Sequence, residues 1–315
     1  MKNLHTFSDY DIHFFGSGVE NSPDRIIRQD NNKQLLGTCV IPKTMQELQN
    51  LAIAISDKQI QLLQKWRLLK IHNRKLKTAF PIINKNQISQ LRKCTQVVAR
   101  KILQTIEPDV SDFTNKIKQQ KQINPYLLFF SYIMDNLAWD HFSKIKAMPD
   151  FDYKDGLWWG MIWGTSTPRS FFLGTNGYNY KGGNLQVVWN YDLLPLLEPL
   201  FLHPEKIPQA LKGLTIPALF EQPKDPIYQS SLKLSKKLAE TVLAYLDLPN
   251  LTLEYKLPDI KQALIIIYHE IIWDILKEVE ETGLLIRPKI INKPENIKKD
   301  NLTDLMFLIQ PAKAV

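Results

Sequence analysis

The chain has 315 residues, 44% of them hydrophobic and 23% charged, which is enough apolar material for a sizeable core and favours two domains over one. It contains no apolar run of the roughly 18 residues that a membrane-spanning helix needs and no secretory signal pattern, so we expect a cytoplasmic protein without a membrane partner. The two cysteines, Cys39 and Cys94, are too few and too far apart for a disulfide scaffold or a cysteine-based zinc site.

The net charge of +8 is concentrated in one stretch of the chain. Between Asp57 and Lys101 there are 12 basic residues and one acidic residue, so this stretch carries a formal charge of +11 and the rest of the chain −3. A local excess of this kind indicates a surface for a polyanion, whereas a uniformly basic protein would spread the charge. The alternative is a helical surface whose basic side chains are only solvated.

The first residues predict an arm, a helix and a short strand. Residues 1–21 show no sustained periodicity and are expected to be irregular. A serine and a proline begin a helical pattern that a glycine at position 37 can end, so we expect a helix over residues 22–36. Residues 38–41 include β-branched side chains and precede a proline, which favours a small strand.

Two helix starts of the capping-box type follow, twelve residues apart. In the first, Thr44 is followed three residues later by Glu47, and in the second Ser56 is followed by Gln59. In this motif the hydroxyl and the longer side chain each accept a hydrogen bond from a backbone amide that the helix leaves unpaired. The spacing predicts two short helices joined by a tight turn.

The hydrophobic period changes after the second of these helices. From residue 69 to residue 81 apolar and polar residues alternate on either side of His72-Asn73-Arg74, which predicts a two-stranded hairpin that bends at these residues. A helical period returns over residues 87–106, and this long helix is expected to end before Pro108. The predicted order is helix, strand, helix, turn, helix, hairpin and long helix.

This order, together with the two helix caps, resembles the winged helix-turn-helix domain of bacterial regulators such as the MarR-like and ArsR-like groups. The resemblance covers about residues 22–83 and rests on element order and capping. It implies that the helix from Ser56 to Trp66 is the recognition helix and that residues 69–81 form the wing. It also implies a homodimer, assembled through the helix over residues 87–106.

The side chains expected to face outward on the recognition helix and at the hairpin bend can reach base edges or phosphates. Lysine and arginine neutralise phosphates, while glutamine can pair with adenine and lysine with guanine. We expect the helix to enter the major groove of double-stranded DNA and the bend to lie beside the minor groove or the backbone. The predicted DNA-binding residues are Lys58, Gln59, Gln61, Gln64, Lys65, His72, Asn73, Arg74, Lys75 and Lys77.

Beyond Pro108 the chain changes character, with longer hydrophobic helices and an aromatic, glycine-rich tract. Residues 193–226 contain so many prolines that this stretch can form only short helices. The predicted elements are a polar helical connector over 111–121, a hydrophobic helix over 126–142, strands within 156–189, short helices within 193–226, long helices over 228–246 and 258–282, and strands at 284–290 and 305–309.

The aromatic tract over residues 156–189 predicts three or four antiparallel strands, because Asn176-Gly177 and Gly182-Gly183 are hairpin signals. A sheet with clustered rings beside glycines can line a pocket for a planar or apolar effector. The alternative is a sheet whose rings pack on neighbouring helices. The predicted ligand-binding residues are Trp158, Trp159, Trp163, Arg169, Asn176, Tyr178, Tyr180, Asn184 and Trp189.

No motif indicates catalysis, a metal or a cofactor. The segment that begins HEIIWD at His269 has Trp273 where a zinc metalloprotease has its second histidine, so we expect a hydrogen-bonded pair in a core or interface there. Asp135, Asp140 and His141 are interpreted as polar residues at a helix end rather than as a metal or acid-base cluster. A nucleophile elbow, a P-loop and a dinucleotide-binding fingerprint are absent from the sequence.

These patterns predict a mainly helical α+β protein with an arm (1–21), a winged helix-turn-helix domain and long helix (22–108), and a larger α+β domain with a small antiparallel sheet (109–315). The predicted function is a DNA-binding transcriptional regulator whose C-terminal domain senses a ligand or mediates assembly. Two alternatives stay open: an enzyme acting on a small molecule or peptide, with the winged helix as a docking module, and a winged-helix adaptor between proteins. RNA also stays open as a partner, although aromatic residues are not interleaved with the basic ones as a stacking platform would need.

Overall fold

The computed structural model describes residues 10–18, 23–120, 123–150, 158–197, 203–293 and 299–311. In these ranges the protein is α+β and mainly helical, as predicted, and the strands form three small sheets. The chain divides into two compact units: unit 1 comprises residues 1–93, 148–169 and 248–267, and unit 2 comprises residues 94–147, 170–247 and 268–315. None of the described helices is long and apolar enough to cross a membrane.

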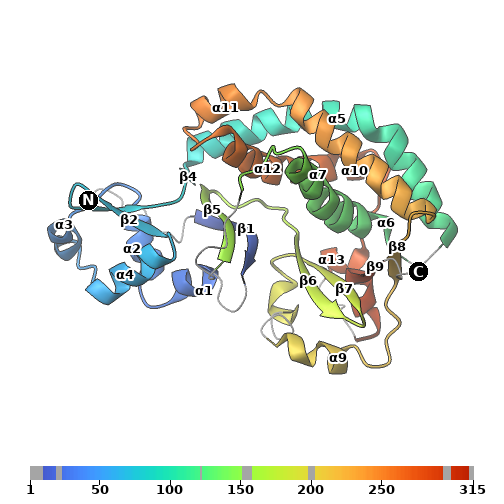
Figure 1. Ribbon diagram of the computed structural model, residues 1–315, viewed down its shortest axis with the longest axis horizontal. Coiled ribbons are helices and arrows are strands. Elements are labelled where there is room, and N and C mark those ends of the chain that lie inside the picture. Colours follow the sequence, from blue (N-terminus) through green and yellow to red (C-terminus); the bar gives the residue numbers. More distant parts are fainter. Residues whose placement is uncertain are drawn as a thin grey trace. The chain divides into compact units, whose positions relative to one another are not determined.

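After its first strand, unit 1 contains four short helices and a hairpin (blue in Figure 1), and the two capped helices and the hairpin follow one another in the predicted order. The expected capping box is present, because the Thr44 hydroxyl accepts from the Glu47 amide at 3.2 Å and the Glu47 carboxylate accepts from the Thr44 amide at 2.7 Å. The elements are α1 (Pro23–Arg28), α2 (Asn32–Thr38), α3 (Met45–Asn50), α4 (Asp57–Lys65), β2 (Leu69–His72) and β3 (Lys75–Thr78).

These elements enclose one hydrophobic core. Leu35, Leu48 and Leu63, from α2, α3 and α4, are fully buried in it, and Leu76 of the hairpin closes it. Burial of large aliphatic side chains is worth about 1.5–3 kcal/mol each, which is enough to hold short helices that would not form alone. Ile162, from much later in the chain, belongs to the same core.

Two local predictions in this part were wrong. The helix expected over residues 22–36 is two helices, α1 and α2, separated at Asp30, whose φ of 47° interrupts the helical backbone. The strand expected over residues 38–41 is absent, because residue 38 ends α2 and the following residues form turns. Just after this segment, Lys43 forms a single antiparallel bridge with Leu76 of the hairpin.

A second sheet in unit 1 joins distant segments in the order β1-β5-β4. β1 (Tyr10–Gly18) runs antiparallel to β5 (Trp158–Ser166), and β4 (Ile82–Ile83) pairs with β5 in parallel. The expected irregular arm therefore contains a strand over residues 10–18; the rest of the arm lies outside the described residues. Unit 1 also contains α11 (Leu248–Glu254).

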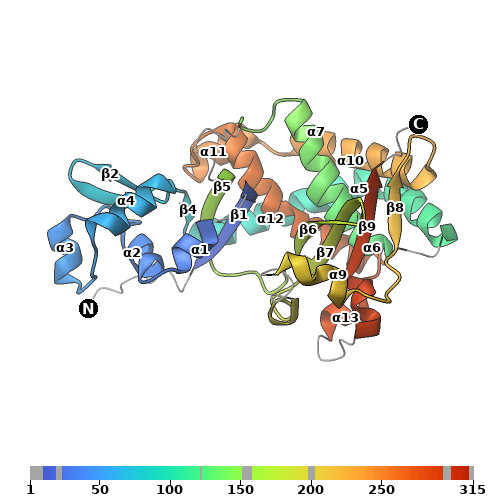
Figure 2. The same cartoon turned by 60° about the horizontal axis from the view of Figure 1, so that its bottom comes forward.

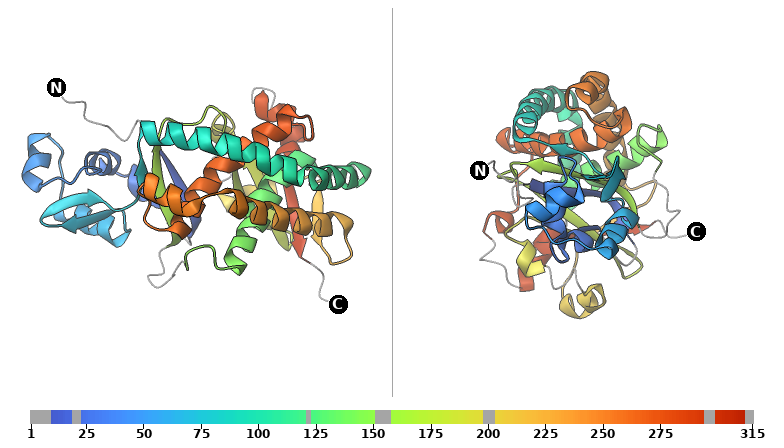
Figure 3. Two further views of the ribbon diagram at one scale, coloured as in Figure 1. Left: turned by 90° about the horizontal axis from the view of Figure 1, so that it is seen from above. Right: turned by 90° about the vertical axis from the view of Figure 1, so that its left-hand side faces the viewer.

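The long helix α5 (Lys85–Gln120) does not end before Pro108, and the expected connector over residues 111–121 is largely its continuation. Proline costs a helix one backbone hydrogen bond, about 3 kcal/mol. Tertiary contacts offset that cost, because Val110 and Phe113 are fully buried and Asp109 is held by two lysines of α10. Figures 1 and 3 show α10 (Pro226–Tyr245) alongside the C-terminal part of α5.

The hydrophobic helix predicted over residues 126–142 is present, but its middle is a π-helix. α6 (Pro125–Leu127), the π-helix η2 (Leu128–Leu137) and α7 (Ala138–Lys144) follow one another without a break. The predicted long helices over 228–246 and 258–282 are confirmed as α10 and α12 (Ile260–Glu281). Contacts link α10 to η2 and to α7, so these helices form one layer of unit 2.

The sheet of unit 2 has the strand order β6-β7-β9-β8 (Figure 2). The β6–β7 hairpin turns at Lys181-Gly182, so the hairpin signal at Gly182-Gly183 is confirmed, whereas Asn176-Gly177 lies inside β6. The strand predicted at 305–309 is confirmed as β9, and the one at 284–290 is absent. The elements are β6 (Gly174–Tyr180), β7 (Gly183–Trp189), η3 (Pro204–Lys206), α9 (Ile207–Ala210), β8 (Ala218–Glu221), α13 (Lys289–Asn292), η5 (Lys299–Leu305) and β9 (Met306–Pro311).

Candidate functional site

The helix α4 has one buried side and one side rich in long polar residues. Its N-cap is Ser56, whose hydroxyl accepts from the Gln59 amide at 3.2 Å, and its buried residues Ile60 and Leu63 are one turn apart. This spacing turns the remaining positions toward solvent. The exposed candidates on α4 are Lys58, Gln61, Gln64 and Lys65.

Gln59 differs from the other DNA-binding candidates because its side-chain amide donates hydrogen bonds to other residues of unit 1. Its Nε2 donates to the Oδ1 atoms of Asn31 and Asn32, both at 2.7 Å. Asn32 is buried and donates in turn to the carbonyl oxygen of Ile26 at 2.7 Å. Gln59 therefore joins α4 to the α1–α2 segment, and its side chain is only half-exposed.

The β2–β3 hairpin presents the other candidates. Asn73 and Arg74 occupy its two-residue bend with φ of 48° and 58°, the left-handed values that a type I′ turn requires at both positions. Leu76 and Thr78 face the core, and the Thr78 hydroxyl donates to the Leu36 carbonyl oxygen at 2.5 Å. The exposed candidates on the hairpin are His72, Asn73, Arg74, Lys75 and Lys77.

Among the cationic candidates on α4 and the hairpin, Lys75 lies close enough to Glu47 to contribute, after the Thr44 hydrogen bonds, to its lowered pKa. Lys58, Lys65, Arg74, Lys75 and Lys77 form no ion pair in the described ranges. We call these five residues, with Gln61, Gln64, His72 and Asn73, the basic face. Its charges are available to an external polyanion.

The nine predicted ligand-binding residues come from both units. Trp158, Trp159 and Trp163 belong to β5 in a sheet of unit 1, whereas β6 and β7 belong to the sheet of unit 2. The single sheet expected over residues 156–189 was therefore wrong, because β5 pairs with β1 rather than β6. The side chains of Trp158 and Trp159 lie outside the described residues. Arg169 is half-buried at the end of the unit 1 segment.

Trp163 is a core residue rather than a pocket residue. It is fully buried and stacks on His13 of β1, with 5.2 Å between the ring centroids. The Nε2 of His13 and the Oγ1 of Thr165 are 2.9 Å apart, which ties β1 to β5 through side chains as well as backbone. The alternative interpretation, in which the rings pack within the protein, holds for this residue.

The five remaining residues lie on β6 and β7 of unit 2. The indole of Trp189 donates to the Oδ1 of Asn176 at 2.7 Å, and the Nδ2 of Asn176 donates to the Tyr178 hydroxyl at 3.2 Å. These three side chains bind one another on one face of the sheet. Tyr180 and Asn184 instead line an open hollow of about 610 Å³ at the hairpin end of the sheet.

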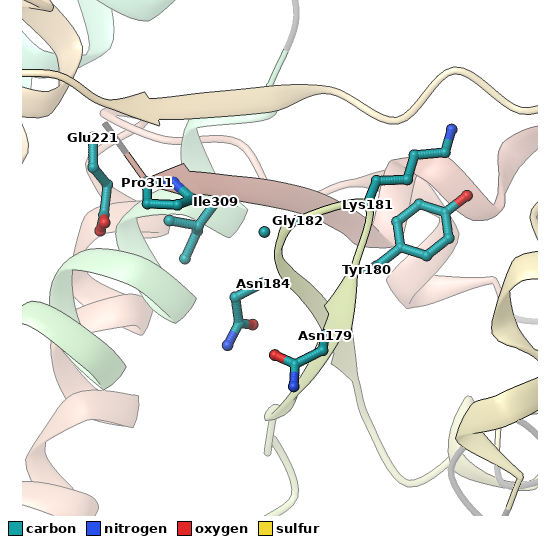
Figure 4. A pocket seen from close by; sticks show the side chains of 9 residues that line it. Asn179, Tyr180, Lys181, Gly182, Asn184, Glu221, Ile309 and Pro311 are labelled. Atoms are coloured by element: carbon teal, nitrogen blue, oxygen red, sulfur yellow. The ribbon is translucent and has the colours of Figure 1, made fainter. Parts of the chain in front are cut away.

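Sequence reasoning missed most of the hollow. Figure 4 shows Asn179 and Asn184 on one side of the hairpin and the side chains of Tyr180 and Lys181 turned away from them. Glu221 also lines the hollow, because β8 pairs with β9 and places Glu221 beside Pro311. The unpredicted lining residues are Asn179, Lys181, Gly182, Gly183, Glu221, Ile309 and Pro311.

Two of the three polar residues near the end of the hydrophobic helix lie close to other side chains. The Trp139 indole donates to Asp135 at 3.3 Å, and His141 lies 3.9 Å from Glu240. Burial raises the pKa of Asp135 to about 7, although the bond from Trp139 opposes the shift. Among the described residues no three His, Cys, Asp or Glu side chains are close enough to hold a metal ion.

In comparisons with known proteins, no family model, no curated protein and no solved structure matches the chain.

Proposed function

We propose that the protein binds double-stranded DNA through a winged helix-turn-helix unit formed by residues 23–83. The support is the order of α1 to α4 and the β2–β3 hairpin, with the Lys43–Leu76 bridge as a minimal third strand. In this arrangement α4 is the helix that enters the major groove and the hairpin is the wing. A homodimer would allow two such helices to contact two half-sites, and the role agrees with the expected cytoplasmic location.

One observation carries the proposal. The stretch that holds all of the chain's excess positive charge is also the stretch whose cationic side chains point outward from α4 and the hairpin without an ion pair in the described ranges. Six such side chains, the five cations of the basic face and Lys70 of β2, supply enough phosphate contacts for salt-dependent binding. The glutamines between them can read base edges.

The test is fluorescence anisotropy with a random-sequence duplex over a salt series. A variant that replaces Lys58, Lys65, Arg74 and Lys75 with alanine removes four charges from the basic face. The matched control replaces four exposed lysines of unit 2 that form no ion pair in the described part of the chain, Lys206, Lys212, Lys224 and Lys293, with alanine.

The wild type and the control variant are expected to bind with a steep dependence of affinity on salt, and the basic-face variant is expected to lose up to about four units of that slope, roughly one for each phosphate contact. Equal losses in the two variants would mean that only net charge matters, and the basic face would then have no special role. Absence of binding at low salt by the folded wild type would contradict the proposal itself.

A further inference from the structure

The hollow at the hairpin end of the unit 2 sheet contains an unneutralised carboxylate. Glu221, at the end of β8, is half-buried, and its Oε1 accepts a hydrogen bond from the Tyr132 hydroxyl at 2.7 Å. Its second oxygen, Oε2, has no hydrogen-bond partner among the described residues. A half-buried carboxylate with an open oxygen is a strong acceptor for a charged donor.

The carboxylate of Asp140 lies near the same tyrosines as that of Glu221. The pKa of Tyr132 is raised, first by burial and then by its bond to Glu221 and by the charges of Glu221 and Asp140. The pKa of Tyr228 is also raised by burial and by the same two carboxylates. Glu221, Asp140 and the two phenols therefore form one group, drawn from β8, α7, η2 and α10.

No basic side chain in the described ranges balances this group. Glu221 and Asp140 form no ion pair there. Lys181 belongs to the rim of the hollow, but its Nζ lies 5.2 Å from the centre of the Tyr180 ring, and Figure 4 shows both side chains turned away from Asn179 and Asn184. Of this group, Glu221 lines the hollow, so its carboxylate faces an open space in a protein whose net charge is positive.

The other walls of the hollow fit an organic cation better than a metal ion. Asn179, whose amide has no partner in the described part of the chain, offers a carbonyl oxygen, while Ile309 and Pro311 form an apolar wall. A space of about 610 Å³ is far larger than a metal ion, and a hard cation would need more carboxylates than these. An ammonium group, by contrast, needs a few separated acceptors for its three donors.

We propose that this hollow binds a small alkyl diamine in its diammonium form. One ammonium group donates to Oε2 of Glu221, the methylene chain lies against Ile309 and Pro311, and the second ammonium group donates to Asn179 and the hairpin carbonyls. The proposal concerns unit 2 alone and does not depend on DNA binding by unit 1.

The test is isothermal titration of the full chain with 1,4-diaminobutane, with 1,4-butanediol as the neutral ligand of the same length. Glu221→Gln keeps an oxygen that accepts from Tyr132 and removes the charge. Glu254→Gln is the matched control, because Glu254 is an exposed glutamate of α11 without an ion pair in the described ranges. Asn179→Lys places a tethered ammonium group in the hollow without removing a hydrogen bond present in the described part of the chain.

The wild type and Glu254→Gln are expected to bind the diamine with equal affinity and the diol not at all. Glu221→Gln is expected to bind the diamine about 10-fold more weakly, since a charge-assisted hydrogen bond becomes a neutral one, and Asn179→Lys is expected to abolish binding. Equal binding of diamine and diol, equal losses in both glutamine variants, or binding of Mg²⁺ alone would each overturn the proposal. If Glu221→Gln fails to fold, Asn179→Lys decides the question by itself.

Discussion

The Nε2 of Gln59 on α4 donates to the Oδ1 of Asn32 on α2 over 2.7 Å, and Asn32 is almost completely buried. Because Asn32 also donates to Ile26, the two amides form a short chain of hydrogen bonds that runs across three helices. The orientation of α4 in unit 1 is therefore fixed by polar contacts as well as by the packing of Ile60 and Leu63. Gln59, which the sequence predicts to face DNA, thus helps to hold α4 in place.

Gln59→Ala is expected to lower the free energy of unfolding by about 2 kcal/mol, because it removes two hydrogen bonds and leaves the buried Asn32 amide short of a partner. Gln61→Ala, on the exposed side of the same helix, is expected to change it by less than about 0.5 kcal/mol. Urea unfolding followed by circular dichroism measures both. Similar values for the two variants would mean that the Gln59 bonds contribute nothing net.

Ala52→Gly is expected to stabilise the protein by about 1 kcal/mol. Ala52 follows α3 with a φ of 55°, and the Ile53 amide reaches back to the Leu48 carbonyl, the Schellman arrangement that normally has glycine at this position. A left-handed residue with a Cβ costs about 1 kcal/mol. Ala54→Gly is the control, because Ala54 has no positive φ, and it should not raise the melting temperature.

Local sequence signals were sufficient to predict the capped helices and the hairpin of unit 1. The caps at Thr44 and Ser56 and the alternating hairpin depend on residues a few positions apart, and each was predicted close to its observed bounds. The end of α5 was misplaced because Pro108 is a local signal that contacts from α10 override. The β1–β5 sheet could not be predicted, since its register joins residues about 150 positions apart.

Asp109→Asn is expected to lower the free energy of unfolding at pH 7 by about 2 kcal/mol. The Asp109 carboxylate is buried and accepts from Lys233 at 2.7 Å and from Lys237 at 2.5 Å. Burial raises the pKa of Asp109, but the two lysines outweigh it and the net pKa is lowered. A carboxyl whose folded pKa is lowered adds stability that is present above its unfolded pKa near 4 and is lost as the pH falls through the folded value.

The difference between wild type and Asp109→Asn should therefore shrink as the pH falls below about 4. Chemical unfolding at a series of pH values measures it, with Asp304→Asn, at an exposed residue without an ion pair in the described ranges, as the control. A difference that is constant from pH 3 to pH 7 would show that the lysine contacts do not act through the charge of Asp109.

Asp135→Asn is expected to have the opposite pH dependence. The folded pKa of about 7 lies above the unfolded value near 4, so the cost of ionising Asp135 grows between these pH values and is complete above about 7. The amide keeps an oxygen for the Trp139 indole and carries no charge. The variant should match the wild type near pH 4 and exceed it by about 2 kcal/mol at pH 8, and a pH-independent difference would rule out this explanation.

The candidate sites differ in how far the sequence could define them. The exposure of the side chains in the basic face could be predicted, because charge and helical period determine which side chains of α4 point outward. The partial burial of Gln59 could not, since it depends on a contact with a distant segment. The hollow could not be predicted, since Glu221 comes from a proline-rich stretch and meets the hairpin only through β9. The aromatic tract suggested one sheet over residues 156–189, but the pairing of β5 with β1 divides its strands between two sheets.

Arg74→Gly is expected to separate fold stability from DNA binding. Arg74 has a φ of 58° at the second position of the type I′ bend, where glycine is preferred, so the variant should be about 1 kcal/mol more stable than the wild type. If the hairpin contacts phosphates as we propose, the same variant should lose about one unit of the salt slope for duplex binding, because one cation is removed.

Arg74→Lys is the matched control for this prediction, since it keeps both the charge and the left-handed strain, and it should resemble the wild type in thermal melts and in anisotropy titrations. A more stable Arg74→Gly variant with an unchanged salt slope would mean that the hairpin bend lies away from the phosphates, and α4 alone would then have to account for binding. Stability and affinity that fall together would instead show that Arg74 supports the hairpin. Opposite changes in the two measurements are the result that only a strained, phosphate-contacting arginine explains.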